Sequence, residues 1–345
     1  MLRAIYNFDH CAKSATLTAG STVNPSVGFG YSNATLLAPA SIGVGADGFM
    51  GGYIAGGTVN VAFDMTGIIP ANPTKVTFGW RVRTLQVYSN THAMISFSVP
   101  GTPNDTTAYM MTISPAAAPW VPAVGNDVYV ELTYDFTTFT ATAMVNGAPV
   151  AVTAGPVPSA AQKAAFVSGA WTINFVLANS LNARYAYRDI YVLDAVAGDG
   201  MVTPLGPQKM FPISLDAADG TGWVATGAGT TMDALNTALP ANPYSTSPSD
   251  KTPLVTSLKT NAPAGSRVNA VSLSMSGTSI GDVASTSKVE ISQGGANVAA
   301  KFVAVAKAIT YGAPIGLFPK APDGGSWDLS KIDLTTLKLT PDTIS

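Results

Sequence analysis

The stretch that decides the fold is residues 75–83, which read KVTFGWRVR. Large apolar side chains occupy every second position, and Thr, Gly and Arg stand between them: the apolar set is Val76, Phe78, Trp80 and Val82. Successive side chains of a strand point to opposite faces, so this alternation predicts a strand with one face turned toward a core. We expect Trp80 to be buried in that core.

A three-stranded meander follows later in the chain. Residues 127–134 (DVYVELTY) and 139–145 (FTATAMV) are rich in strand formers, and residues 135–138 form a short turn between them. The second strand runs into Asn146-Gly147, a pair that tolerates positive φ and favours a type I′ turn. Residues 148–152 then return as a third strand.

The rest of the chain repeats this pattern of short strands between Gly, Pro, Asn and Asp clusters. We predict further strands at 92–99, 109–114, 171–177, 185–193, 209–215, 222–226, 267–276, 288–292, 300–309 and 334–339. Helical periodicity is nearly absent. Short helices are expected at 160–166, capped by Ser159, and at 232–239. The class is all-β: a jelly-roll sandwich followed by a second, smaller β-sandwich.

The length of 345 residues suits two domains with separate cores. Residues 195–200 read AVAGDG, a small-residue stretch typical of a linker, so we place the domains at 1–197 and 198–345. Residues 240–253 carry four prolines and are expected to form an extended arm without a place in a sheet ladder. Candidate contacts of this arm with a neighbouring subunit are Pro240, Pro243, Tyr244 and Pro248.

Charge is scarce, because Asp, Glu, Lys and Arg make up 11% of the chain against roughly 25% in ordinary soluble proteins. Such a surface suits a subunit that its neighbours cover. The formal net charge is -2 and no Lys or Arg run occurs, which argues against nucleic acid as a partner. The sequence contains no uninterrupted stretch of about 20 apolar residues, so it predicts no membrane-spanning helix. Residues 1–13 lack the apolar core of a secretory signal, so we expect synthesis in a cytoplasm.

Groups for catalysis are few. The two glutamates, Glu131 and Glu290, fall in different predicted domains, and no second acid follows at the spacing of paired strand carboxylates. The two histidines, His10 and His92, have no Gly-x-Ser-x-Gly partner motif. The sequence therefore predicts no enzyme and no cofactor.

Metal sites are weakly indicated. His10 and the single cysteine, Cys11, are adjacent and would point to opposite faces of a strand. Two acidic clusters fit either tight turns or calcium sites, and we favour turns: Asp199 between two glycines, and Asp216 with Asp219.

One aromatic residue is a candidate for glycan contact. Trp120 lies in a Pro-rich segment, SPAAAPWVPA, at residues 114–123. It would either stack on a sugar at the surface or close the open end of the sandwich, and large aromatics are mostly buried.

Short motifs along most of the chain resemble one family, the structural proteins of tailed-bacteriophage virions that carry a concanavalin-like (laminin-G-like) jelly roll and a smaller C-terminal β domain. The resemblance rests on Asn7-Phe8-Asp9-His10, YVEL at 129–132 with Tyr134-Asp135, Asn146-Gly147, RDIYVLD at 188–194, Leu205-Gly206, Asp219-Gly220, Trp223 and GSWDL at 325–329. The chain departs from the family at Arg188, where an acidic residue often stands, and in the upstream position of Trp120. No ligand site is carried over.

The resemblance implies a structural role in a virion assembled in the host cytoplasm. The leading hypothesis is a subunit of the tail, collar or fibre-attachment region that packs against copies of itself and other virion proteins. The alternatives are a capsid decoration protein and a glycan-binding adhesin module that contacts the host surface.

Overall fold

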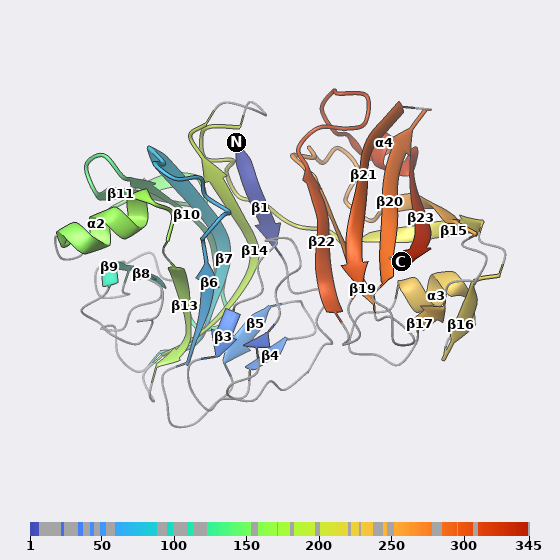
Figure 1. Ribbon diagram of the computed structural model, residues 1–345. Helices are drawn as coiled ribbons and strands as arrows, with labels where there is room; N and C mark the ends of the chain where they lie inside the picture. The colour runs from blue at the N-terminus through green and yellow to red at the C-terminus, as the bar shows by residue number, and fades with distance from the viewer. Residues whose placement is uncertain are drawn as a thin grey trace. The chain divides into compact units, whose positions relative to one another are not determined.

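The structure is a computed structural model (Figure 1). It describes residues 1–6, 22–23, 34–36, 42–44, 49–52, 59–87, 95–98, 109–113, 123–152, 158–170, 172–179, 183–196, 201–219, 222–227, 229–236, 244–246, 252–277, 285–294, 296–305 and 310–343. The chain divides into two compact units, the first ending at Met210 and the second beginning at Phe211. Each unit is described separately below.

The first unit is built from antiparallel strands. In chain order they are β1 (Leu2–Tyr6), β2 (Thr22–Val23), β3 (Ala34–Leu36), β4 (Ile42–Val44), β5 (Met50–Gly52), β6 (Val59–Asp64), β7 (Lys75–Val87), β8 (Ile95–Ser98), β9 (Tyr109–Ile113), β10 (Asp127–Asp135), β11 (Thr140–Val145), β12 (Ala148–Val150), β13 (Thr172–Asn179) and β14 (Ala183–Asp194). One helix, α2 (Ala160–Val167), accompanies them.

The strands form two layers that meet at the β13–β14 hairpin. One layer runs β12-β11-β10-β7-β14, and β14 pairs with β7 along its whole length. In the other layer β13 lies between β6 and β8. Among the described residues, β13 and β14 pair at the hairpin corner, where Ala178 is opposite Arg184 and Asn179 is opposite Ala183. This arrangement is a β-sandwich.

The central strand β7 confirms the predicted alternation. Its four large apolar side chains are fully buried, and β10 adds Val130, Leu132 and Tyr134 to the same face. Tyr134 also packs edge-on against Phe136, with ring centroids 5.0 Å apart, and Phe166 of α2 joins them at 6.0 Å from Tyr134. The sequence prediction for this strand and for its buried tryptophan is therefore confirmed.

Local turn and cap chemistry also follows the sequence. Asn146 and Gly147 both have positive φ, 49° and 82°, as a type I′ turn requires, and β10, β11 and β12 form the predicted meander. The Ser159 hydroxyl accepts the amide of Gln162, whose side chain in turn accepts the Ser159 amide. This capping box fixes the start of α2 at the predicted place.

The second unit is a smaller sandwich. Its elements are β15 (Ile213–Asp219), β16 (Val224–Thr226), α3 (Thr231–Leu235), β17 (Tyr244–Thr246), β18 (Leu254–Thr260), β19 (Val271–Gly277), β20 (Ser285–Gln293), β21 (Ala296–Val305), β22 (Thr310–Phe318), α4 (Leu329–Asp333) and β23 (Thr335–Thr343). The sheet β15-β18-β23-β20-β21 packs against the pair β19-β22 through Leu258, Val271, Trp327 and Ile332. Trp327 donates from Nε1 to the Phe318 carbonyl at 2.8 Å.

Three features of this unit differ from the sequence predictions. β18, β22 and α4 were not predicted. The strand expected from residue 209 begins at Ile213, and residues 209–210 belong to the first unit. Within the expected Pro-rich arm, Tyr244–Thr246 pairs with β16, so these three residues take part in a ladder of their own chain.

No helix in the part of the chain that the structure describes is long and apolar enough to cross a bilayer.

Candidate functional site

The outer face of the first unit's main sheet, opposite the core, carries its polar side chains in rows across the strands. One row joins Tyr191 of β14, Gly79 of β7, Glu131 of β10 and Met144 of β11, which are paired in register. The next row contains Thr77, Thr133 and Thr142. The hydroxyls of Thr77 and Thr133 are hydrogen-bonded at 2.8 Å.

Gly79 makes the first row possible. A Cβ at this position would overlap the Tyr191 ring, so only a glycine lets the ring lie across β7. The Tyr191 ring thereby crosses β7 from β14 to β10, where its hydroxyl donates a hydrogen bond to Glu131 Oε1. Burial raises the pKa of Tyr191 well above its ordinary value, and its hydrogen bond to Glu131 raises it further.

Residues 201–210, here called the strap, run back across this outer face. The amide of Leu205 donates to Tyr191 Oη at 3.1 Å, and the amide of Gly206 donates to Glu131 Oε1 at 2.9 Å. Further along, the Gln208 carbonyl accepts from Arg81 Nη2 at 3.2 Å. The predicted domain boundary lies before the strap, at 197/198, whereas the compact units divide after it, because the strap is hydrogen-bonded to the first unit's sheet.

A buried ionic network anchors the far end of the strap. Asp189, at a bulge in β14 with φ of 52°, is completely buried. Its Oδ2 lies 3.1 Å from Nε of both Arg81 and Arg188, and its Oδ1 accepts the Met210 amide at 2.9 Å. The Tyr129 hydroxyl donates to the Asp189 carbonyl at 3.1 Å. Asp189 thus fixes two strands and the strap at one point.

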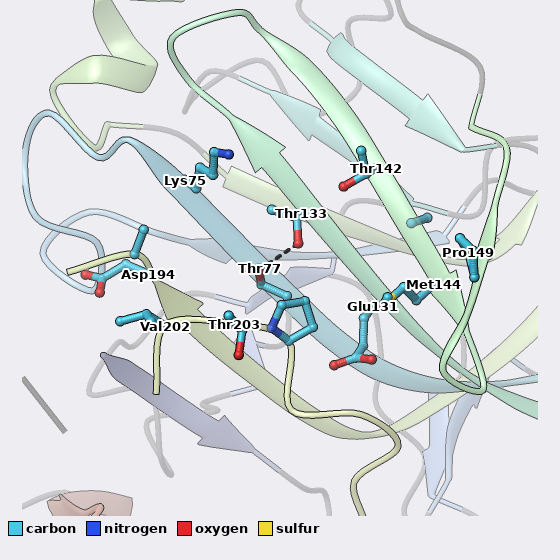
Figure 2. Close-up of a pocket in the computed structure, with 13 residues that line it drawn as sticks. Lys75, Thr77, Glu131, Thr133, Thr142, Met144, Pro149, Asp194, Val202 and Thr203 are labelled. Atoms are coloured by element: carbon cyan, nitrogen blue, oxygen red, sulfur yellow. Dashed lines mark hydrogen bonds between the residues drawn. The ribbon is translucent and has the colours of Figure 1, made fainter. Parts of the chain in front are cut away.

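A pocket with a volume of about 370 Å³ lies on this outer face between the meander and the strap (Figure 2). Threonines, two acids and one lysine are its polar lining residues, and the strap contributes one wall. The lining includes Lys75, Thr77, Glu131, Thr133, Thr142, Met144, Pro149, Asp194, Val202, Thr203 and Pro204. All of these residues belong to the first unit.

Glu131 is the unusual member of this lining. Only 2% of the residue is exposed, and both donors to its Oε1, the Tyr191 hydroxyl and the Gly206 amide, are uncharged. Its second oxygen, Oε2, is buried and has no hydrogen-bond partner among the residues that the structure describes. Buried polar atoms are nearly always paired, and leaving one unpaired costs about 1–3 kcal/mol, more for a charged group. Glu131 therefore combines a position in the pocket lining with one oxygen that no described residue bonds.

The other charged side chains of the pocket have partners. Lys75 Nζ lies 3.4 Å from Asp135 Oδ2, and Asp194 Oδ2 lies 2.5 Å from Arg3 Nε. The pKa of Asp135 is lowered to about 2, first by the Thr137 hydroxyl and then by backbone amides and Lys75. Asp194 Oδ1 accepts the Val196 amide at 3.1 Å, so both oxygens of Asp194 are in use.

The structure brings together groups that sequence reasoning kept apart. The sequence places the two glutamates, Glu131 and Glu290, in different domains and offers no nearby partner acid, whereas the acid that shares the pocket of Glu131 is Asp194, 63 positions later. A local signal did exist. Glu131, Thr133 and Asp135 alternate with buried apolar residues, which predicts a polar outer face on β10.

The residues that the sequence suggested for contacts lie elsewhere. Trp120, Pro240, Pro243 and Pro248 are outside the described residues, as are His10, Cys11, His92 and Asp199. Tyr244 begins β17. Glu290 is in the second unit. Asp216 lies 3.8 Å from Lys259 Nζ, and among the described residues no three His, Cys, Asp or Glu gather as metal ligands.

Comparison with known proteins gives little further information. No protein family and no curated protein matches the sequence. Among solved structures, the chain is similar to a sialidase, with a TM-score of 0.32 and 10% identity over 46% of this chain and 16% of that one. It is also similar to the N-terminal CBM22-1-CBM22-2 tandem of Paenibacillus barcinonensis Xyn10C, with a TM-score of 0.30 and 10% identity over 100% of this chain and 90% of that one. TM-scores and identities this low support no conclusion about activity. The strand pairing of the chain itself shows an all-β protein of sandwich architecture.

Proposed function

We propose that the chain is a non-enzymatic recognition protein whose first unit binds a glycan in the pocket between the meander and the strap. The observation that carries this proposal is the pocket lining, in which Glu131 stands beside three threonines on neighbouring strands; among the described residues no group bonds Glu131 Oε2. If the Glu131 side chain turned so that a ligand hydroxyl could reach this buried oxygen, the new hydrogen bond would remove the cost of leaving it unpaired.

The rest of the lining fits a ligand with many hydroxyls. Thr77, Thr133 and Thr142 place three hydroxyls, each able to donate and accept, on neighbouring strands. Met144, Pro149 and Pro204 supply apolar surface for the C–H face of a sugar ring. A few polar groups on a mainly apolar wall are typical of small-molecule sites, whose volumes run from about 300 to 1,000 Å³.

The arrangement of the acids supports binding without hydrolysis. Glycoside hydrolysis needs two carboxyl groups that exchange protons with the substrate or a water. Asp194 shares the pocket with Glu131, but Arg3 and the Val196 amide occupy both of its oxygens. Glu131 could accept a hydrogen bond from a sugar hydroxyl. Asp194 would first have to break its ion pair with Arg3 before it could exchange a proton.

The test is binding of the whole chain to a panel of bacterial surface glycans, measured by calorimetry for the wild type, Glu131→Gln and Glu290→Gln. We expect Glu131→Gln to weaken binding by roughly tenfold, corresponding to a lost charge-assisted hydrogen bond. The matched Glu290→Gln change, in the second unit, should leave it intact. If no glycan binds, or if Glu131→Gln binds equally well, the proposal is wrong; release of reducing ends by the wild type would make the chain an enzyme.

A second candidate function is a structural subunit of a phage particle. The 11% content of charged residues favours it, because a surface with so little charge suits burial between subunits. The motifs that resemble virion proteins favour it as well. Particles from cells that express the chain with its neighbouring genes should contain it at a fixed copy number. An adhesin of such a particle would combine both functions.

A further inference from the structure

We propose that the pocket prefers a 6-deoxyhexose, a sugar that carries a methyl group in place of the hydroxymethyl group of an ordinary hexose, and that this methyl group contacts Val202 of the strap. This inference rests on the proposed function and names the class of sugar that the pocket selects. Two features of the lining support it: most of its polar groups are already bonded within the chain, and apolar residues stand beside them.

The lysine and the aspartate of the lining are held in ion pairs. Lys75 is paired with Asp135, and Asp194 is paired with both Arg3 and the Met1 ammonium group. A sugar hydroxyl is uncharged and would compete with charged partners for these side chains. The two residues therefore add little to the binding of a further hydroxyl.

Glu131 and two of the threonines have partners as well. Glu131 Oε1 accepts the Tyr191 hydroxyl and the Gly206 amide, and its buried Oε2 meets a ligand only if the side chain turns. The hydroxyls of Thr77 and Thr133 bond each other at 2.8 Å. Because one of these hydroxyls donates to the other, the pair keeps a single donor for a ligand.

The remaining polar residues of the lining are Thr142 of β11 and Thr203 of the strap. Together with the Thr77–Thr133 pair they can bond a few hydroxyls of one sugar ring, since each threonine hydroxyl has one donor and two acceptor positions. A further hydroxyl inside the pocket would lack a partner. Leaving a buried polar group unpaired lowers affinity by about fivefold or more.

Apolar residues of the lining come from both sides of the chain fold, the meander with Met144 and Pro149 and the strap with Val202 and Pro204 (Figure 2). Val202 is the member with the most to gain from a ligand. Its residue is 43% exposed, and among the exposed large hydrophobic side chains of the described residues it is the one in the lining. A methyl group against Val202 leaves water without leaving a polar group unpaired.

The size of the pocket acts in the same direction. Its volume of about 370 Å³ is at the lower end of the usual range for ligand sites. The Leu205 and Gly206 amides fix the strap to Tyr191 and Glu131, so widening the pocket would break these bonds. The smaller methyl substituent is therefore favoured over a hydroxymethyl group.

The experiment compares two pairs of methyl glycosides by calorimetry on the full chain. The members of each pair differ only by the hydroxyl on carbon 6: the L-rhamnoside with the L-mannoside, and the L-fucoside with the L-galactoside. In at least one pair the deoxy sugar should bind about fivefold more tightly than its partner. The comparison uses the wild-type chain, so it does not depend on whether a variant folds.

Variants then assign the preference to one side chain. Val202→Thr replaces a methyl group by a hydroxyl of similar size and offers a partner to the hydroxymethyl group, so the ratio of the two affinities should fall toward one. Val124→Thr is the matched control, because Val124 is also exposed but is not among the lining residues, and it should leave the ratio unchanged.

Three results would overturn the inference and leave the proposed function standing. The first is equal or tighter binding of the hydroxymethyl sugar in both pairs, and the second is a full preference retained by Val202→Thr. The third is binding of neither pair although another glycan of the wider panel binds. If no glycan binds at all, both the inference and the proposed function are wrong.

Discussion

The two glutamates of the chain occupy opposite environments on similar elements. Each lies near the middle of a sheet strand, Glu131 on β10 of the first unit and Glu290 on β20 of the second. Glu290 is partly exposed. Its Oε1 lies 2.8 Å from Lys288 Nζ, and its Oε2 lies 3.7 Å from Lys338 Nζ. Glu131 is buried and held by neutral donors.

This contrast separates a structural carboxylate from a candidate binding group. The lysines lower the pKa of Glu290, Lys288 contributing most, and satisfy its charge at the surface. Nothing comparable neutralises Glu131 among the residues that the structure describes. Glu131 therefore has only uncharged donors among the described residues, whereas Glu290 is held by two lysines.

The largest effect should come from breaking the network that fixes the first unit's outer face. Asp189→Ala leaves Arg81 and Arg188 without their buried partner and frees the Met210 amide. Removing one partner of a buried ion pair typically costs about 3–5 kcal/mol. Hydrogen exchange followed by mass spectrometry should show faster exchange in β7, β14 and the strap. Unchanged protection there would mean that the strap is held by other contacts.

A smaller loss is expected where Tyr191 crosses β7. Gly79→Ala places a methyl group in the space of the Tyr191 ring and should cost about 1–3 kcal/mol, the usual range for overpacking. The same change in a Tyr191→Ala background has no ring to displace.

A double-mutant cycle on unfolding free energy therefore isolates the contact. We expect Gly79→Ala to be much less costly when Tyr191 is absent. Equal costs in both backgrounds would show that the glycine serves the backbone of β7 and not the aromatic side chain.

The smallest effect should come from Glu290→Gln, which removes a surface ion pair. At neutral pH the free energy of unfolding should change by no more than about 0.5 kcal/mol. Because the folded pKa of Glu290 lies below its unfolded value, its contribution is present above the unfolded pKa and is lost as pH falls through the folded pKa. The variant and the wild type should therefore converge in acid. A difference that grows as the pH falls would contradict this assignment.

Local patterns in the sequence were enough for several elements. The period-2 alternation of β7, the turn at Asn146-Gly147 and the cap at Ser159 were all predictable, because each depends on residues within a few positions of one another. β18 was missed although Leu254, Thr256 and Leu258 alternate with less buried residues. The four prolines of residues 240–253 led instead to the prediction of an extended arm.

The sequence by itself determined that the chain is all-β and that Trp80 is a core residue. Only the tertiary structure decided where Glu131 finds its neighbours. Tyr191 and Gly206 lie 60 and 75 positions away, and they meet Glu131 because strand register and the path of the strap place them there. Register is a property of the whole sheet, so no local pattern around residue 131 encodes which donors its carboxylate meets or which oxygen remains unpaired.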